Sequence, residues 1–140
     1  MPADDDAFEF IRLISGVNRQ IEQSIEARLK PEGVSIEHFR VLDALMRENG
    51  LPMSELARQV LVDGPTLTKI VDRVIAASDV YRGADPQDRR KVLIFLSQKG
   101  RKRFETLRGL LSEPAAAIKT LGRDRSQKLR TLLRSVAGDL

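Results

Sequence analysis

The chain has 140 residues, 41% of them hydrophobic and 31% charged, which suits one domain with a core of ordinary size. Its longest apolar run is five residues, 92–96, and it begins with acidic residues at positions 4–6, so we expect neither a transmembrane helix nor a secretory signal. The absence of cysteine excludes disulfides, thiolate metal sites and cysteine redox chemistry. A cytoplasmic protein without a membrane partner is predicted.

The net charge of +4 is unevenly distributed along the chain. Residues 82–103 contain eight lysines and arginines against two aspartates, whereas residues 1–53 are net acidic. Such a basic segment indicates a polyanionic partner. A solvated charged surface explains the charge alone equally well.

The first half of the chain has the spacing of helices. Apolar residues recur every three or four positions from Phe8 to Leu29, which predicts a long amphipathic helix that stops near Pro31 and Gly33. Ser35 is the expected N-cap of a second helix, after which Gly50 suits a left-handed exit.

Residues 54–61 and 64–77 are predicted to form two short helices, with Asp63 as the N-cap of the second. Because only residues 61–64 separate them, they are typical of a helix-turn-helix motif. The second helix buries one apolar stripe. Around the rest of its surface lie the side-chain types that contact bases and phosphates in a major groove, namely Pro65, Thr66, Thr68, Lys69 and Arg73.

Two strand-like runs, 80–82 and 91–96, flank a segment rich in Gly, Pro and Asp, and together they predict a β-hairpin with a charged tip. Ser97 is the expected cap of a further long helix, which must bend or restart near Pro114. Gly122 indicates a break before a last helix. The predicted fold class is therefore mainly α with a small β-hairpin (α+β).

Catalytic chemistry finds little support in the sequence. His38 is the only histidine, and the glycines match no phosphate-binding motif. Asp85 and Asp88 lie beside two arginines, which favours ion pairing over proton transfer. We predict no enzymatic activity, no cofactor and no metal site, and we expect His38 to be structural.

Several motifs follow one another in the order of these elements: Leu56-Ala57, Thr66-Leu67-Thr68-Lys69, Asp85-Pro86-Gln87-Asp88-Arg89-Arg90 and Leu96-Ser97-x-x-Gly100. This string resembles the MarR family of winged-helix transcriptional regulators. The resemblance covers residues 33–103 by motif and the flanking helices by pattern. It implies a single domain, 1–140, in which residues 33–103 form a winged helix-turn-helix DNA-binding lobe and residues 1–32 and 104–140 form dimerisation helices.

The resemblance also implies a homodimer that reads an inverted repeat in double-stranded DNA. Two apolar stripes would make the dimer contact: Phe8, Ile11 and Ile14 near the start, and Leu129, Leu132, Leu133 and Val136 near the end. Burial of these stripes independently calls for a partner.

By the same resemblance, the major-groove contacts are Pro65, Thr66, Thr68, Lys69 and Arg73, and the hairpin is a wing. Arg90 of the wing would enter the minor groove, Asp88 would pair with it, and Arg89 is its neighbour.

One position departs from the family pattern. Where members commonly have a glycine with positive φ after the recognition helix, this chain has Ser78-Asp79. We expect Asp79 to take the left-handed conformation, since aspartate tolerates it better than most residues. The angle between the recognition helix and the wing depends on this turn.

Many members release DNA when a small aromatic or anionic effector binds between the two lobes. Candidate effector-binding residues, where the first, second and fifth helices meet, are Asn18, Arg19, His38, Phe39 and Phe104. Core packing is the alternative role of the aromatic residues.

Two functions are consistent with the sequence. The first is a sequence-specific DNA-binding transcriptional regulator, a homodimeric repressor released by a small-molecule effector. The alternative is a winged-helix protein-interaction module whose basic wing binds an acidic protein partner.

Overall fold

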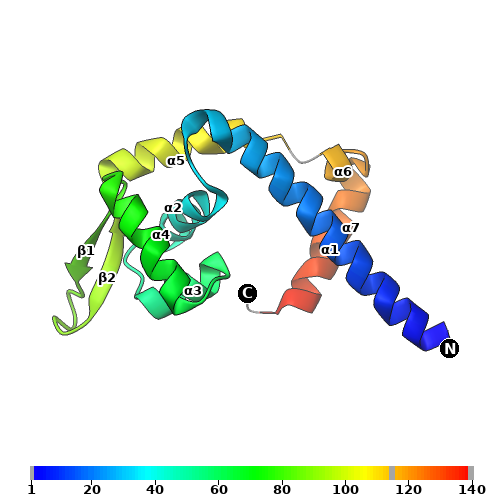
Figure 1. Cartoon of the computed structure of the whole chain (residues 1–140), viewed down its shortest axis with the longest axis horizontal. Coiled ribbons are helices and arrows are strands. Elements are labelled where there is room, and N and C mark those ends of the chain that lie inside the picture. The colour runs from blue at the N-terminus through cyan, green and yellow to red at the C-terminus, as the bar shows by residue number, and fades with distance from the viewer. Residues whose placement is uncertain (1, 114–115, 139–140) are drawn as a thin grey trace.

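The computed structural model describes residues 2–113 and 116–138. The chain is mostly helical with one antiparallel hairpin, as the sequence predicts (Figure 1). Its elements are α1 (Pro2–Leu29), η1 (Lys30–Glu32), α2 (Ile36–Arg47), α3 (Met53–Val60), α4 (Gly64–Ala76), β1 (Val80–Ala84), β2 (Val92–Leu96), α5 (Gln98–Leu110), α6 (Ala116–Lys119) and α7 (Gly122–Ala137).

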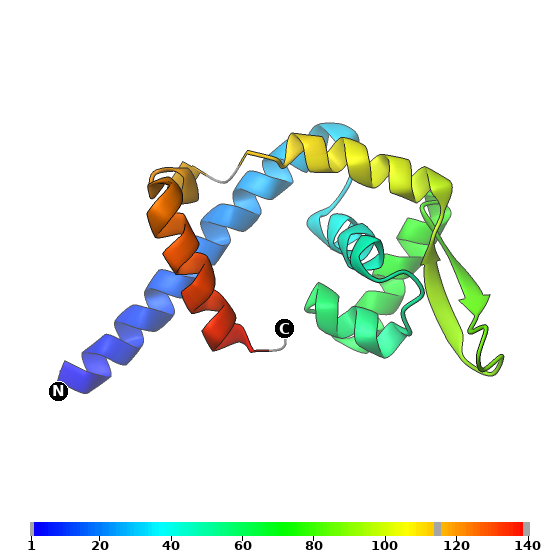
Figure 2. The same cartoon turned by 180° about the vertical axis from the view of Figure 1, so that it is seen from behind.

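The molecule has two ends. Helices α2, α3 and α4 and the hairpin gather at one end, whereas α1 and α7 extend toward the other (Figures 1 and 2). Helix α5 runs from the hairpin to the C-terminal part of α1. The hairpin and α4 are thereby held at a distance from the two terminal helices.

Capping side chains set the starts of three helices, as predicted. The hydroxyl of Ser35 accepts a hydrogen bond from the backbone N–H of His38 at 3.1 Å, and Ser97 accepts one from Gly100 at 2.9 Å. The carboxylate of Asp63 accepts from Thr66 at 2.7 Å. Each cap satisfies an N–H that the helix itself leaves unpaired.

The hairpin register pairs Val80 with Leu96 and Ala84 with Val92. An isolated bridge between Leu51 and Ile94 ties β2 to the segment before α3, and the side chain of Asn49 accepts a further bond from the N–H of Leu96 at 2.8 Å. The hairpin is therefore attached to the helical core through β2.

One hydrophobic core joins the helix-turn-helix segment, the hairpin and the flanking helices. Its fully buried apolar side chains come from α1, α2, α3, α4, β2 and α5, and they include Leu29, Leu42, Leu56, Val71, Ile94 and Leu107. The first and fifth helices thus contribute to the core of the lobe as well as flanking it.

The turn after α4 differs from the expectation. Ser78 has the positive φ, 63°, whereas Asp79 is fully buried and belongs to the core of the lobe. The prediction that Asp79 takes the left-handed conformation is therefore wrong. The exposed Ser78 makes the turn, which leaves the next side chain free to point inward.

The C-terminal part is divided as expected. Helix α5 ends at Leu110 and α7 begins at Gly122, which has a φ of 75°. Pro114, near which a bend or restart is predicted, lies outside the described residues. Across the described ranges, no helix has the length and apolar content needed to cross a bilayer.

Candidate nucleic-acid interface

Helix α4 presents a polar surface that its N-terminal cap positions. Asp63 accepts a hydrogen bond from Thr66, and this bond lowers the pKa of the Asp63 carboxyl below its ordinary value. With Pro65 in the first turn, where its missing N–H leaves no bond unmade, the helix begins sharply at Gly64.

The two faces of α4 are divided as the sequence predicts. Leu67, Ile70, Val71 and Val74 are buried against the core. The candidate DNA-contacting side chains are all exposed: Pro65, Thr66, Thr68, Lys69 and Arg73. Together they offer hydroxyls, cations and apolar groups, which are the groups that contact base edges and phosphates.

The hairpin β1–β2 and its loop, residues 85–91, are called the wing from here on. The loop is closed by backbone hydrogen bonds, of which Asp85 N–H to Lys91 O measures 3.0 Å. The carboxylate of Asp88 accepts a hydrogen bond from the backbone N–H of Arg90 at 3.1 Å. The distance between Asp88 Oδ1 and Arg90 Nε is 3.6 Å. Asp88 thus orders the loop and pairs with Arg90.

The guanidinium of Arg90 is available to a partner, because its side chain is 95% exposed. Arg89 is exposed beside it. Within the described residues, Lys69, Arg73 and Arg89 form no ion pair with an acidic side chain. Helix α4 and the wing therefore present cations to which a polyanion can supply the counter-charge.

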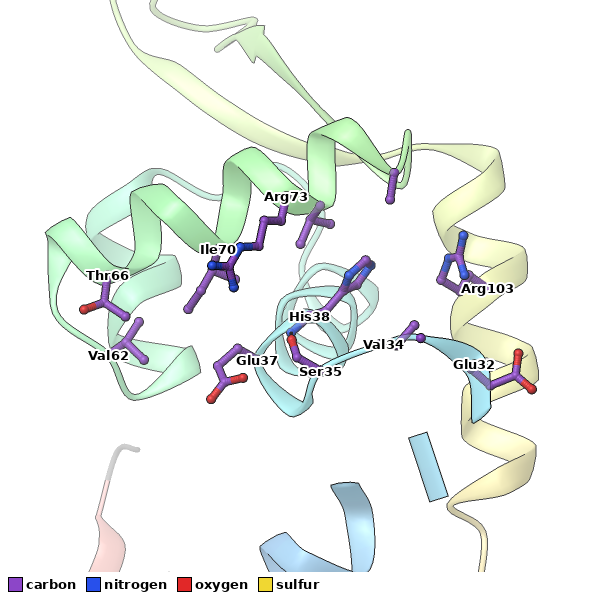
Figure 3. Close-up of a pocket in the computed structure, with 13 residues that line it drawn as sticks. Glu32, Val34, Ser35, Glu37, His38, Val62, Thr66, Ile70, Arg73 and Arg103 are labelled. Carbon is purple, nitrogen blue, oxygen red and sulfur yellow. Dashed lines mark hydrogen bonds between the residues drawn. The ribbon is translucent and has the colours of Figure 1, made fainter. Parts of the chain in front are cut away.

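The five candidate effector residues do not line one cavity. His38 lines a cavity of about 730 Å³ together with Arg73 and Arg103, shown in Figure 3. Phe39 and Phe104 stack with ring centroids 5.7 Å apart and line a second cavity, of about 630 Å³. Asn18 and Arg19 are exposed on α1.

The cavity in Figure 3 lies beside α4, and two of the candidate DNA-contacting side chains, Thr66 and Arg73, contribute to its lining. It is bordered by α2, α4 and α5, and its polar lining includes the acids Glu32 and Glu37 as well as the basic side chains already named. Over the parts of the chain that the structure describes, no group of three or more His, Cys, Asp or Glu residues could hold a metal ion.

A buried charge cluster that the sequence did not indicate lies behind the interface. Asp79 lies 2.7 Å from His38 Nε2 and 2.7 Å from Arg103 Nε, in each case through its Oδ2. No local pattern could have indicated this cluster, because the three residues are far apart in the sequence. The sequence offered one hint, which is that Asp79 directly precedes a predicted strand, but it did not indicate the partners of Asp79.

Comparison with known proteins shows similarity to one family of regulators. A family model described as MarR family matches residues 32–91. The HTH-type transcriptional regulator TtmR of Methylorubrum extorquens is 40% identical over 63 residues, which are 45% of this chain and 32% of that relative. The matched segment thus spans about a third of the relative's length.

Two further matches extend over nearly the whole chain. The multiple antibiotic resistance protein MarR of Escherichia coli is 28% identical over 127 residues, covering 89% of this chain and 88% of that protein. The crystal structure of a cysteine-to-serine mutant of Escherichia coli MarR, complexed with operator DNA, has a TM-score of 0.82 at 27% identity and covers 94% of this chain and 96% of that one. The family model over residues 32–91, the MarR relative and the shared fold all support a MarR-family winged-helix transcriptional regulator.

Proposed function

We propose that the protein is a homodimeric repressor that binds an inverted-repeat operator and leaves it when a small effector binds. One observation carries the proposal: the polar side chains of α4 and the side chain of Arg90 in the wing are both exposed to solvent. A helix inserted in a major groove and an arginine in the adjoining minor groove form one continuous contact with a duplex.

The chemistry of the two features suits the two grooves. On α4, Thr66 and Lys69 can meet base edges or phosphates, and Pro65 can contact a thymine methyl. A narrow minor groove concentrates negative potential and attracts an arginine. Asp88 limits the rotamers of Arg90 and so directs it.

Exposed apolar side chains at the far end of the molecule support a dimer. Phe8, Ile11 and Ile14 on α1 and Leu132, Leu133 and Val136 on α7 are each more than half exposed. Soluble monomers rarely leave such a patch uncovered. Two copies related by a two-fold axis would place their α4 helices in half-sites about one helical turn, ~34 Å, apart.

The cavities beside α4 and α5 support effector control. Arg73 and Arg103 in the larger cavity suit an anionic group, and the stacked Phe39 and Phe104 suit an aromatic one. A ligand there releases DNA only if it binds more tightly to a conformation with a different separation of the two α4 helices. His38 also lines the larger cavity, whereas Asn18 and Arg19, the other two candidates, are exposed on α1 and line neither cavity. In this role the protein acts in the cytoplasm and catalyses no reaction.

In-vitro selection from random duplex DNA at near-physiological salt tests the proposal. Wild type, Arg90→Ala and the control Arg47→Ala are compared. The control also removes one exposed positive charge, but on α2, away from the proposed contacts. We expect wild type and the control to enrich the same inverted repeat and Arg90→Ala to bind it roughly tenfold more weakly.

A different pattern would overturn the proposal. It would consist of no enriched motif, binding that depends only on salt, and equal affinities for the three proteins. That result would favour the alternative, a module whose basic wing binds an acidic protein.

A further inference from the structure

The junction between α4 and the wing contains a buried carboxylate. Among the described residues, Asp79 is the one charged side chain in the buried core, with an exposed fraction of 0%. It lies between the end of α4 and the first residue of β1. A carboxylate at this depth must be compensated by neighbouring cations or hydrogen-bond donors.

Two side chains from two different helices compensate it. His38 of α2, which is 12% exposed, and Arg103 of α5, which is 28% exposed, both lie 2.7 Å from Asp79 Oδ2. Because an ionised carboxylate only accepts hydrogen bonds, the His38 ring donates from Nε2. We call Asp79, His38 and Arg103 the junction cluster.

The backbone of Asp79 is held as firmly as its side chain. Its N–H donates to the carbonyl of Val74 in α4 at 3.1 Å. Its carbonyl accepts from the N–H of Ser97 at 2.9 Å and from the hydroxyl of Ser97 at 2.9 Å. Since Ser97 is the N-cap of α5, one residue links α4, the start of β1, α5 and α2.

The cluster lies between the two features proposed to contact DNA. The contacts proposed for the major groove lie on α4, and the one proposed for the minor groove lies on the wing. Their relative placement depends on the chain direction at residues 77–80, where Ser78 turns with a φ of 63° and Asp79 is anchored. A freely moving junction would let the wing leave its groove while α4 stays bound.

We propose that the junction cluster is a positioning device that holds the wing at the angle at which Arg90 and α4 contact one half-site together. This inference rests on the proposed DNA-binding function. None of the three side chains needs to touch DNA. They act through the orientation of Arg90.

A double-mutant cycle between the cluster and Arg90 tests the proposal. Affinity for the selected operator is measured for wild type, His38→Ala, Arg90→Ala and the double variant. In wild type we expect Arg90→Ala to weaken binding roughly tenfold. In the His38→Ala background, the same change should weaken it by no more than about twofold, because a misplaced Arg90 contributes little.

Two controls separate positioning from general stability. His38→Gln keeps a side-chain donor near Asp79 and should restore most of the effect of Arg90. Asp43→Asn removes an exposed carboxylate that pairs with Arg47 on the same helix, and should leave the effect unchanged. Circular dichroism first establishes that each variant folds. If His38→Ala fails to fold, Arg103→Ala takes its place in the cycle.

The two possible failures are distinguishable. An equal loss from Arg90→Ala in both backgrounds would overturn the positioning role and leave DNA binding intact. If Arg90→Ala costs wild type no affinity, the proposed wing contact is wrong, and the inference falls with it.

Discussion

Two exposed residues with side chains adopt the left-handed backbone conformation in the DNA-binding lobe. Leu61 ends α3 with a φ of 66°, and Ser78 follows α4 with a φ of 63°. Each lies at a turn that orients α4, so both strain and function are concentrated there. For an L-residue this conformation costs roughly 1–2 kcal/mol relative to the right-handed one.

Replacing Ser78 by glycine should stabilise the protein. Glycine adopts the required φ without strain, and it loses part of this gain through the greater freedom of the unfolded chain. We expect Ser78→Gly to raise the unfolding free energy by about 1 kcal/mol, measured by urea denaturation at one protein concentration. Ala76→Gly, at the last residue of α4, should instead lower it, by up to about 1 kcal/mol, because glycine is the poorer helix former. A loss of stability in Ser78→Gly would contradict the account of this turn.

The cap at Asp63 should make stability depend on pH. Hydrogen bonds from Thr66 lower the pKa of the Asp63 carboxyl in the folded protein, so its stabilising contribution is present above the ordinary value and is lost as the pH falls through the folded-state pKa. Asp63→Ala should therefore be less stable than wild type at pH 7, with a smaller difference below about pH 4.

Denaturant unfolding at pH 7 and pH 3 checks this prediction. Asp63→Asn is the matched control, because its side-chain oxygen still accepts a hydrogen bond but does not titrate. The difference in stability between Asp63→Asn and Asp63→Ala should change little with pH. A wild-type advantage over Asp63→Ala of the same size at both pH values would show that the carboxylate charge is irrelevant to the cap.

At the scale of elements, helix α5 and the junction after α4 are packed backbone against backbone. A Cβ added at Gly100 would lie 2.0 Å from the carbonyl oxygen of Asp79, which is far inside contact distance. At Gly109, near the other end of α5, an added Cβ would meet nothing within 4 Å. The same helix therefore has one glycine that the packing requires and one that it does not.

The two glycines should respond in opposite directions to the same change. Gly100→Ala is expected to lower the unfolding free energy by about 2–3 kcal/mol, because α5 must move away from Asp79. Gly109→Ala should raise it by roughly 0.5–1 kcal/mol, because alanine is the better helix former. Thermal and urea unfolding of both variants measure this. Equal and small effects would show that α5 can shift at no cost.

At the scale of the whole molecule, the described chain does not bury its terminal helices. Positions 6–20 of α1 are all exposed, and α7 has no buried residue among those described. The exposed side chains include several large apolar ones, such as Phe8, Phe10, Ile11 and Leu13. The lobe has a core of its own, whereas the exposed apolar side chains of these helices form the surface proposed to meet a second copy.

Negative charges introduced at the exposed apolar positions of α1 should therefore dissociate the proposed dimer. We expect wild type to have twice the chain mass of 15.7 kDa in sedimentation equilibrium, and Ile11→Glu combined with Ile14→Glu to have the mass of one chain. The monomer should bind the inverted repeat at least roughly a hundredfold more weakly, since two linked sites bind far more tightly than one.

A control and a second measurement complete this test. Gln20→Glu adds a negative charge to an exposed polar position of α1 and should leave the dimer intact. Binding to a single half-site should be similar for wild type and the monomeric variant. A wild type that sediments as a monomer at micromolar concentration would contradict the dimer.

The sequence by itself determined the features that depend on neighbouring residues. The helix starts at Ser35, Asp63 and Ser97 can be predicted because each of these side chains accepts a hydrogen bond from the backbone N–H three residues later. The hairpin can be predicted from two apolar runs that flank a turn. The exposed surface of α4 follows from helix geometry, since its apolar positions share one stripe. The same local signals predicted which side chains of α4 face solvent.

Only the tertiary structure decided what lies behind that surface. Asp79 reads as a turn residue in the sequence, yet Ser78 makes the turn and Asp79 is buried between His38 and Arg103. Likewise, the five candidate effector residues divide between two cavities and an exposed helix face. Such contacts join residues that are distant along the chain, and their distances depend on how the helices pack. Local propensity carries no information about that packing, so these features could be found only in the fold.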